Sequence, residues 1–365
     1  MSDLQALVQK HLDDAVNTGR ETGLQVAVYF QGRLVADAWA GWLDDAHTRR
    51  VDGDSLFPVF SCSKGVTATL VHRLAEKGTL SYETPIAAVW PEFAKHGKGA
   101  ITLRHALNHA SGVPHVPEKM TLDEFHDFEL GCKTMADLAP LYPPGRIEYH
   151  ACSYSWLIAG FLQRVDKRPF ARMFHEEVCA PLGIRDMYIG LPAELDARVA
   201  ELREDNPGPF KPNEFGAYTV PPSRHPLHGW MNTPAARRAC LPSSNGIMSA
   251  RAMAKHYAAL VPGGIGGVEL LKPATIKKAT ELYIPPGVKE ADLAGRFGLG
   301  YQLGGGKDSR QGVRATAFGH GGYGGTIAFA DPEYKFAIGV TKNYFSPKPI
   351  HVEIVDVIRK ALEIP

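Results

Sequence analysis

Ser61-Cys62-Ser63-Lys64 lies where an extended run, residues 55–60, gives way to a helix-like run, residues 66–74. A helix places positions i and i+3 on one face, so a helix that opens at Ser61 brings the Lys64 amine within reach of the Ser61 hydroxyl. A serine nucleophile needs this arrangement when no histidine serves as its base. The helix N-terminus adds partial positive charge and free N–H groups where an oxyanion would form.

The same tetrad also has a purely structural interpretation. Ser61 would then cap the helix, and Lys64 would be a solvated side chain of the first turn. Roughly one Ser-x-x-Lys is expected by chance in a chain of this length, although a lysine in the first turn is unfavourable against the helix dipole. Ser63 has no lysine three residues on, and we expect its side chain to point away from that of Ser61. The tetrad alone leaves both interpretations open.

The composition is that of an ordinary globular protein, with 365 residues, 44% of them hydrophobic and 22% charged, and a formal net charge of +1. This length suffices for a large core and two lobes. No basic excess is present to neutralise phosphates, so we expect no nucleic-acid partner. The polar, acidic start carries no secretory signal, and no apolar run approaches the ~20 residues that span a membrane. We therefore expect no association with a membrane.

Several other site types lack their motifs. No Gly-x-Ser-x-Gly elbow occurs, which argues against an α/β-hydrolase, and no Walker-type phosphate loop is present. Residues 175–179 begin like a zinc-protease helix but lack the second histidine, so we expect neither metal nor cofactor. The cysteines are odd in number and scattered, which argues against a disulfide framework and favours a reducing, cytoplasmic location. They are Cys62, Cys132, Cys152, Cys179 and Cys240.

Strand-like segments stand at both ends of the chain, and helix-like segments dominate between them. The patterns predict an α+β fold in which residues 1–60 and 241–365 form a lobe with an antiparallel sheet. Residues 61–240 form an inserted, mainly helical lobe with long loops, and the site lies between the lobes. The predicted strands are 24–30, 34–39, 297–303, 315–318, 326–330 and 336–341, and the predicted flanking helices are 3–17, 249–260, 273–282 and 350–362.

Three ordered motifs make the chain resemble the serine β-lactamase-fold hydrolases, and class C β-lactamases in particular, over nearly its whole length. The first is the tetrad at 61–64. The second, residues 143–151 (PPGRIEYHA), resembles a Pro-Gly…Tyr-x-Asn stretch. The third, residues 319–325 (GHGGYGG), stands where relatives carry Lys-Thr-Gly, Trp-Gly-Gly or His-x-Gly, and residues 103–112 resemble a further loop of the family. The resemblance implies the β-lactamase/penicillin-binding-protein-like fold, with an antiparallel sheet flanked by helices.

Within that superfamily the chain most resembles the family VIII carboxylesterases, because of two departures from the penicillin-recognising enzymes. His320 stands where those enzymes use a lysine to help hold a substrate carboxylate, and a histidine is neutral or partly charged near neutral pH. Ala151 replaces the asparagine that contacts the amide side chain of a lactam. A site without these groups is expected to favour small, fairly apolar, uncharged esters.

The resemblance implies the catalytic roles. Ser61 is expected to attack an ester carbonyl and form an acyl-enzyme. Lys64 is expected to be its base, or to hold Tyr149 in the ionised form, and Tyr149 to shuttle the proton to the leaving alkoxide and then to the deacylating water. The structural alternative for Tyr149 is a half-buried tyrosine with a satisfied hydroxyl. We expect neighbouring His150 to face away from the site.

The third motif is expected to complete the site. Backbone N–H groups of Ser61 and of Tyr323, on a strand after the motif, would form the oxyanion hole. Gly321 and Gly322 would let the substrate approach the backbone closely, or would simply form a hairpin or bulge. His320 is expected either to hydrogen-bond Tyr149 or the substrate, or to be a packed histidine. Tyr154 and Trp156, after the second motif, are expected in the core.

The leading hypothesis is therefore a metal-free serine carboxylesterase whose partner is a small-molecule ester. A second hypothesis keeps the fold but makes the chain a weak β-lactamase, a D-amino-acid peptidase or amidase, or an acyltransferase. A third, a catalytically silent binding protein, is disfavoured because such a protein is expected to lose Ser61, Lys64 or Tyr149, and all three are present. Nothing in the sequence specifies the oligomeric state.

Overall fold

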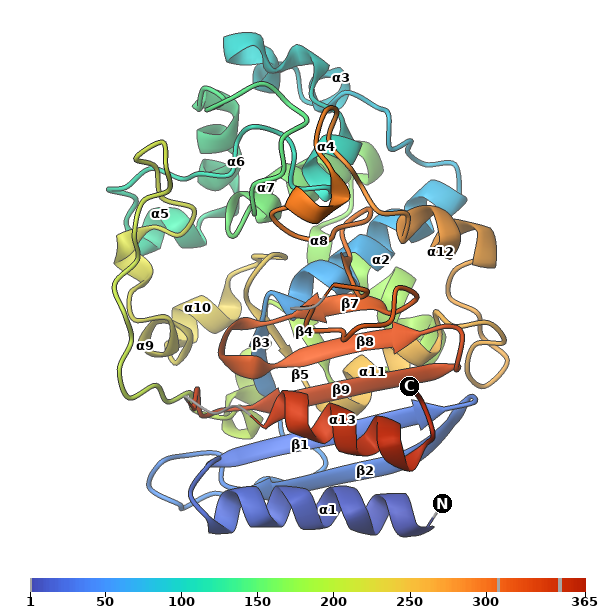
Figure 1. Cartoon of the computed structure of the whole chain (residues 1–365). Helices are drawn as coiled ribbons and strands as arrows, with labels where there is room; N and C mark the ends of the chain where they lie inside the picture. Colours follow the sequence, from blue (N-terminus) through green and yellow to red (C-terminus); the bar gives the residue numbers. More distant parts are fainter. Residues whose placement is uncertain (1, 307–308, 347–349) are drawn as a thin grey trace.

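A six-stranded antiparallel sheet forms the lower half of the molecule in Figure 1, a computed structural model that describes residues 2–306, 309–346 and 350–365. The strand order is β2-β1-β9-β8-β7-β6, and each neighbouring pair is antiparallel. The two ends of the chain therefore share one sheet, as predicted. The strands are β1 Gly23–Phe30, β2 Arg33–Gly41, β6 Gln302–Leu303, β7 Phe318–Gly321, β8 Ile327–Asp331 and β9 Phe336–Lys342.

Helices cover both faces of this sheet. Alternation along β1 sends Leu24, Val26 and Val28 to a core shared with α1 (Ser2–Asn17) and α13 (His351–Ala361). Ala27 and Tyr29 point the other way, into the larger core that contains α2 (Cys62–Glu76) and α11 (Ala250–Ala258). Helix α11 lies against β1, β8 and β9, and α2 lies against β7. The position of α2 places its N-terminus beside the strand that carries the third motif.

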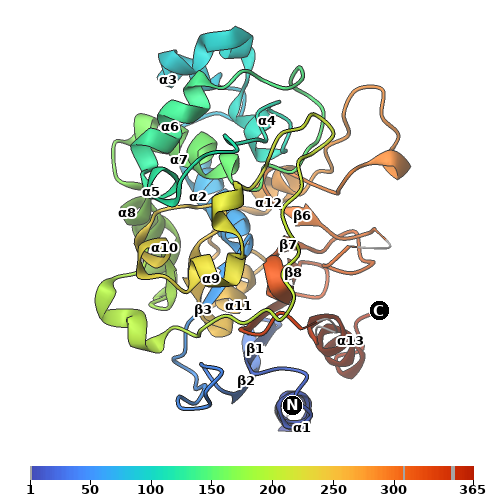
Figure 2. The ribbon, with the colours of Figure 1, turned by 90° about the vertical axis from the view of Figure 1, so that its left-hand side faces the viewer.

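The helical half stands above the sheet in Figures 1 and 2, with α2 and α7 buried at its centre. Its α-helices are α3 Ile86–Val89, α4 Leu103–Leu107, α5 Leu122–His126, α6 Phe128–Asp137, α7 Ser153–Asp166, α8 Phe170–Phe174, α9 Leu227–Met231, α10 Pro234–Arg238 and α12 Pro273–Ala279. Shorter 3-10 or π-helical pieces are η1 Pro91–Ala100, η2 His175–Cys179, η3 Ala180–Leu182, η4 Ala193–Arg198, η5 Pro222–Arg224, η6 Glu290–Asp292 and η7 Tyr323–Gly325.

A second, three-stranded sheet lies behind the nucleophile motif, with strand order β3-β5-β4. The strands are β3 Phe57–Phe60, β5 Gly246–Met248 and β4 Met187–Ile189. Because β4 and β5 come from opposite sides of the predicted boundary at residue 240, this sheet joins the two predicted lobes. The division into lobes stays a prediction.

The sequence misplaced two strands of the main sheet. Residues 297–301 form a turn rather than a strand: Gly300 adopts φ +85°, and the N–H of Gly298 donates to the Tyr301 carbonyl at 3.0 Å. Residues 315–317 are also a turn, so strand β7 begins only at Phe318 and contains the first half of the third motif. The remaining predicted strands and flanking helices agree with the structure to within a few residues.

Further observations concern the cysteines, membrane-spanning helices and metal-binding groups. All five cysteines are free thiols. Among the residues that the structure describes, no helix combines the length and apolar character needed to cross a membrane, and no group of three or more His, Cys, Asp or Glu side chains is arranged to hold a metal ion. The cytoplasmic location stays a prediction.

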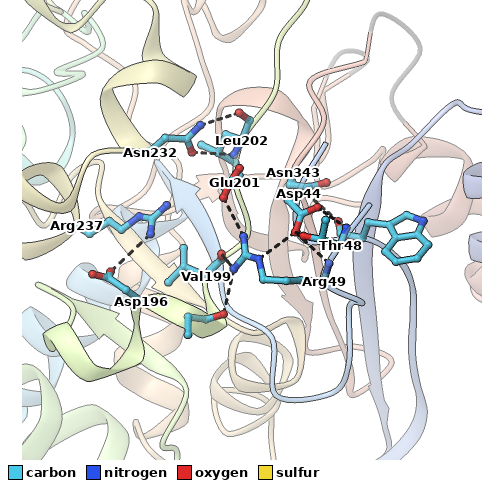
Figure 3. A network of polar contacts seen from close by, with 12 residues as sticks. Asp44, Thr48, Arg49, Asp196, Val199, Glu201, Leu202, Asn232, Arg237 and Asn343 are labelled. Atoms are coloured by element: carbon cyan, nitrogen blue, oxygen red, sulfur yellow. Dashed lines mark hydrogen bonds and ion pairs between the residues drawn. The ribbon is translucent and has the colours of Figure 1, made fainter. Parts of the chain in front are cut away.

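A polar network holds residues 196–205 against the turn that follows β2 (Figure 3). Arg49 bridges Asp44 and Glu201, each at 3.0 Å. The Asn232 side chain accepts from the Leu202 N–H at 2.8 Å and donates to the Leu202 carbonyl at 2.9 Å. The segment then pairs with the end of β9, where the Arg203 N–H donates to the Asn343 carbonyl.

Asn232→Ala is expected to lower the free energy of unfolding by about 1–3 kcal/mol. The reason is that the backbone N–H and the backbone carbonyl of buried Leu202 both lose their hydrogen-bond partner. Urea denaturation would measure the change. Exposed Asn206 makes no side-chain hydrogen bond among the described residues, so Asn206→Ala is the matched control and should change stability little. Equal losses for the two variants would contradict the role given to Asn232.

Candidate active site

Ser61 lies at the tight turn between β3 and α2 and lines a cavity of about 1070 Å³. The residue before it, Phe60, has φ +46°, a left-handed conformation uncommon for a bulky side chain. Ser63 closes this turn, since its hydroxyl donates to the Phe60 carbonyl at 2.5 Å and accepts from the Gly246 N–H at 2.8 Å. Ser61 occupies the N-cap position, but its side chain makes no capping hydrogen bond. Its hydroxyl is therefore left facing the cavity.

Lys64 is buried directly behind Ser61, and its surroundings contradict the interpretation of a solvated lysine. Its Nζ lies 3.4 Å from Ser61 Oγ and donates to the carbonyls of Ala151 and Ser243, each at 2.9 Å. No carboxylate among the described residues pairs with it. Burial lowers the pKa of Lys64 to about 7; the nearby Cys152 thiol opposes this decrease, and the Arg224 guanidinium contributes a smaller part of it. An amine with this pKa accepts a proton near neutral pH.

Tyr149 reaches the same point from the loop that precedes α7. It is half-buried and lines the cavity with Ser61, and its ring centroid lies 4.8 Å from Lys64 Nζ. Burial raises the pKa of Tyr149 above its usual value, and the Ser61 side chain partly offsets the rise. The phenol is therefore protonated near neutral pH. The structure brings together the three residues predicted to be catalytic.

His320 sits on β7 beneath these groups. It is fully buried, its Nδ1 lies 2.8 Å from the Gly321 carbonyl, and its ring is 6.2 Å from that of Tyr149. Burial, with a smaller contribution from Lys64, lowers the pKa of His320 to about 3, so the imidazole is neutral. Of the alternatives for His320, the structure shows the packed histidine and no hydrogen bond to Tyr149. His320, as part of the third motif, packs against Gly65 of α2 rather than lining the cavity.

Gly321 and Gly322 of the third motif line the cavity. Neighbouring atoms of the protein itself leave no room for a side chain at these two positions. A Cβ on Gly322 would lie 2.2 Å from the Val59 carbonyl oxygen, and one on Gly321 would lie 2.7 Å from Cδ of Arg310. The close approach to Val59 packs the third motif against the end of β3. It is this contact that brings the motif alongside Ser61.

Tyr323 lies on the cavity wall but not on a strand, which corrects the sequence prediction. It begins the 3-10 turn η7, between β7 and β8, where Gly324 and Gly325 adopt φ of +79° and +101°. Its side chain is 39% exposed, and its hydroxyl donates to Glu204 at 2.6 Å. Tyr323 thus also ties the cavity rim to the segment held by the network of Figure 3.

The remaining predictions around the second motif agree with the structure. His150 is buried, with its ring nitrogens 2.6 Å from the Ser111 hydroxyl and 2.6 Å from the Glu148 carbonyl, so it supports the loop instead of the site. Tyr154 and Trp156 are completely buried in the core. Ala151 contributes its carbonyl, which accepts from Lys64.

Two arginines near the site were missed from the sequence. Arg224 is buried under the second motif, stacks 3.7 Å from the Trp230 ring centroid and donates to Cys152 Sγ at 3.0 Å. Arg310 lines the cavity itself, on the loop before β7. Both residues lie in irregular segments without a motif, so no local pattern marked them. Position 320 carries no cation, as predicted. The cavity nevertheless contains a cation, the guanidinium of Arg310.

Comparison with known proteins agrees with this geometry. The chain matches the Beta-lactamase family over residues 5–363. It is 31% identical over 344 residues to "Esterase/beta-lactamase LipL" of Mycobacterium tuberculosis (strain ATCC 25618 / H37Rv), covering 88% of this chain and 77% of that protein.

Two solved structures extend the likeness over the whole chain. A family VIII carboxylesterase superposes with a TM-score of 0.86 at 28% identity, covering 98% of this chain and 97% of the other. A penicillin-binding protein homologue from Caulobacter crescentus gives a TM-score of 0.82 at 31% identity, covering 100% and 98%. The resemblance inferred from the three motifs is confirmed: this chain belongs to the beta-lactamase family and is a hydrolase of that fold.

Proposed function

We propose that this protein is a serine carboxylesterase that hydrolyses small, fairly apolar esters through an acyl-enzyme on Ser61. One observation carries the proposal: a buried lysine amine, with no carboxylate partner in the described part of the chain, lies 3.4 Å from a serine hydroxyl that faces a cavity. In acylation, Ser61 Oγ bonds to the ester carbonyl carbon, its proton passes to Lys64, and the alkoxide leaves with a proton from the site. Water then attacks the acyl-enzyme and releases the acid and free Ser61.

Lys64 is better suited than Tyr149 to be the base that accepts the proton from Ser61. The pKa of Lys64 is lowered to about 7, whereas burial raises that of Tyr149 above its usual value of about 10. A base works best when its pKa is near the working pH. Tyr149, close to both Lys64 and the cavity, is then the relay that passes the proton to the leaving alkoxide.

The oxyanion would be held by the backbone N–H groups of Ser61 and Tyr323. Support comes from the helix N-terminus at Ser61, where N–H groups are unpaired and the dipole favours negative charge. Both residues line the same cavity. Gly321, at the end of β7, and Gly322 form the part of the cavity wall that leads to Tyr323. Neutral, buried His320 supports that wall from below.

Hydrolysis of p-nitrophenyl esters from acetate to laurate, with a chromogenic cephalosporin alongside, tests the proposal. Fast turnover of short esters, slow or absent cephalosporin cleavage, and loss of both in Ser61→Ala are the expected results. Ser63→Ala is the matched control: it removes a hydroxyl of the β3–α2 turn and should lower stability while keeping turnover. Full activity of Ser61→Ala would refute the proposal. Absence of turnover by wild type would favour a catalytically silent binding protein.

Weak hydrolysis of β-lactams is the second candidate function. The relative from Mycobacterium tuberculosis is named for both activities, and its sequence aligns with 88% of this chain. The same Ser61 acyl-enzyme would serve both reactions. Efficient cleavage of the cephalosporin by wild type, lost in Ser61→Ala, would make this the main function.

A further inference from the structure

Arg310 reaches across the third motif into the cavity that Ser61 and Tyr149 line. Its Nη1 donates to the Gly322 carbonyl at 2.8 Å, and its Cδ lies where a side chain on Gly321 would stand. The absence of a side chain at 321 thus makes room for the arginine, and the Gly322 carbonyl holds it there. The guanidinium is anchored at the wall that runs into the proposed oxyanion hole.

Arg310 also adds a positive charge to the cavity lining. Among the described residues that line the cavity, the charged ones are Glu290, Arg296 and Arg310. Arg296 pairs with Glu290 at 2.6 Å and donates a second hydrogen bond to the Gly304 carbonyl at 2.9 Å. Among residues 2–306, 309–346 and 350–365, no carboxylate lies within 4.0 Å of a nitrogen of Arg310. Among the described charged residues of the cavity lining, Arg310 is thus the one whose charge is not paired with another side chain.

The chemistry of this charge suits a carboxylate. A guanidinium presents five N–H donors in a planar fork that matches carboxylate geometry. The Gly322 carbonyl engages one nitrogen of Arg310, and the side chain is exposed, so further donors are available to a ligand. The Arg310 charge also acts on the reacting groups, since it lowers the pKa of both Tyr149 and His320, although burial is the larger influence on each.

Apolar side chains form part of the rest of the cavity wall. Ile147 and Phe297 line it beside Tyr149, and Leu293 and Leu303 line it further along. A volume of about 1070 Å³ is ample for a short hydrocarbon chain between the ester group and a charged end. The cavity thus combines a nucleophile, apolar side chains and the anchored guanidinium of Arg310.

We propose that Arg310 binds a carboxylate of the substrate, and that the preferred substrates are small esters with one carboxylate at the end of a short apolar chain. This inference rests on the proposed esterase function and specifies its substrate class. It also replaces the expectation of uncharged esters, which followed from the absence of a cation at position 320. Arg310 supplies a cation from a different segment of the chain.

Two matched pairs of esters test the inference. Monoethyl adipate and ethyl hexanoate share an acyl chain length, but only the first carries a carboxylate, on the acyl side. The acetate ester of 6-hydroxyhexanoate and hexyl acetate make the same comparison on the alcohol side. The readout is the ratio of kcat/KM for the anionic ester to that for the neutral ester, in wild type, Arg310→Gln and Arg310→Lys.

The ratio is expected to exceed one for at least one pair in wild type, and to fall about 10–100-fold in Arg310→Gln, as loss of a charge-assisted hydrogen bond implies. Arg310→Lys should keep part of the preference, and added salt should weaken it in wild type. Arg33→Gln is the control, because Arg33 is exposed on β2, away from the cavity lining, and its loss changes the net charge equally.

The outcomes separate the two proposals. Turnover of the neutral esters by wild type reports the esterase function alone. A ratio that is the same in wild type and Arg310→Gln, or below one for both pairs in wild type, would overturn the role of Arg310 and leave the esterase intact. If Arg310→Gln does not fold, Arg310→Lys and the salt dependence of wild type decide. Absence of all turnover would overturn both proposals.

Discussion

Lys64→Met is expected to lower kcat for ester hydrolysis by about 10²–10⁴-fold while the protein stays folded. The variant keeps the volume of the side chain but removes the amine that lies 3.4 Å from Ser61 Oγ. It also leaves the carbonyls of Ala151 and Ser243 without their donor, so a modest loss of stability should accompany the loss of activity. Assays of p-nitrophenyl ester hydrolysis would measure the loss of kcat, and urea denaturation would measure the loss of stability.

Lys98→Met is the matched control for this change. Lys98 is likewise buried, and its Nζ donates to the backbone carbonyls of Ala136 and Leu138, but it does not line the active-site cavity. Its replacement should affect stability in the same way and leave kcat close to wild type. If the two methionine variants lost activity to the same extent, the loss would reflect folding, and the role of Lys64 as base would be refuted.

The same base predicts the pH dependence of the wild type. The amine accepts a proton only when neutral, and its pKa is lowered to about 7, so kcat/KM should rise with pH through about 7 and then level off. The pH profile of kcat/KM for a neutral ester would measure this. A rising limb at pH 10 or above would instead assign the immediate base to Tyr149, whose pKa is raised.

Lys342→Met is expected to lower the free energy of unfolding by about 3–5 kcal/mol. Lys342 Nζ pairs with Glu21 Oε1 at 2.5 Å between β9 and the segment before β1, and neither side chain has any exposed surface. Removing the lysine leaves a carboxylate buried without its counter-charge. Glu21 also accepts from the Ile350 N–H, so the damage should extend to the start of α13.

The double variant Glu21→Gln, Lys342→Met is the internal control. It removes both charges and keeps an acceptor for the Ile350 N–H, so it should recover most of the stability lost in Lys342→Met. Urea denaturation of the three proteins gives the comparison. A loss below about 1 kcal/mol in Lys342→Met would show that water reaches Glu21 once the lysine is gone.

Local patterns predicted much of the fold. The i, i+3 spacing of Ser61 and Lys64 placed the amine at the hydroxyl because the relation depends only on helix geometry. The composition of residues 24–30 predicted the strand β1, and the structure shows it buried on both faces. Alternation misled in residues 297–301, where Gly298 and Gly300 favour a turn over a strand.

The features that the sequence left undetermined depend on contacts between distant segments. The low pKa of Lys64 follows from burial next to the carbonyls of Ala151 and Ser243, and no local pattern shows that residue 243 returns to the nucleophile. Arg310 reaches the cavity because Gly321 leaves room for it across a turn. Tyr323 was expected on a strand after the third motif, but Gly324 and Gly325 bend the chain there into a 3-10 turn.

The pairing of β1 with β9 has a consequence for how the protein is made on the ribosome. Strand β1 ends at residue 30 and β9 begins at residue 336, so residues 31–335 must be translated before the two meet. At roughly 5–20 residues per second this takes on the order of 15–60 s. Throughout that time one edge of the β1–β2 hairpin stays without its native partner. This open edge can pair with a strand of another chain, so the nascent chain is exposed to aggregation until translation nears its end.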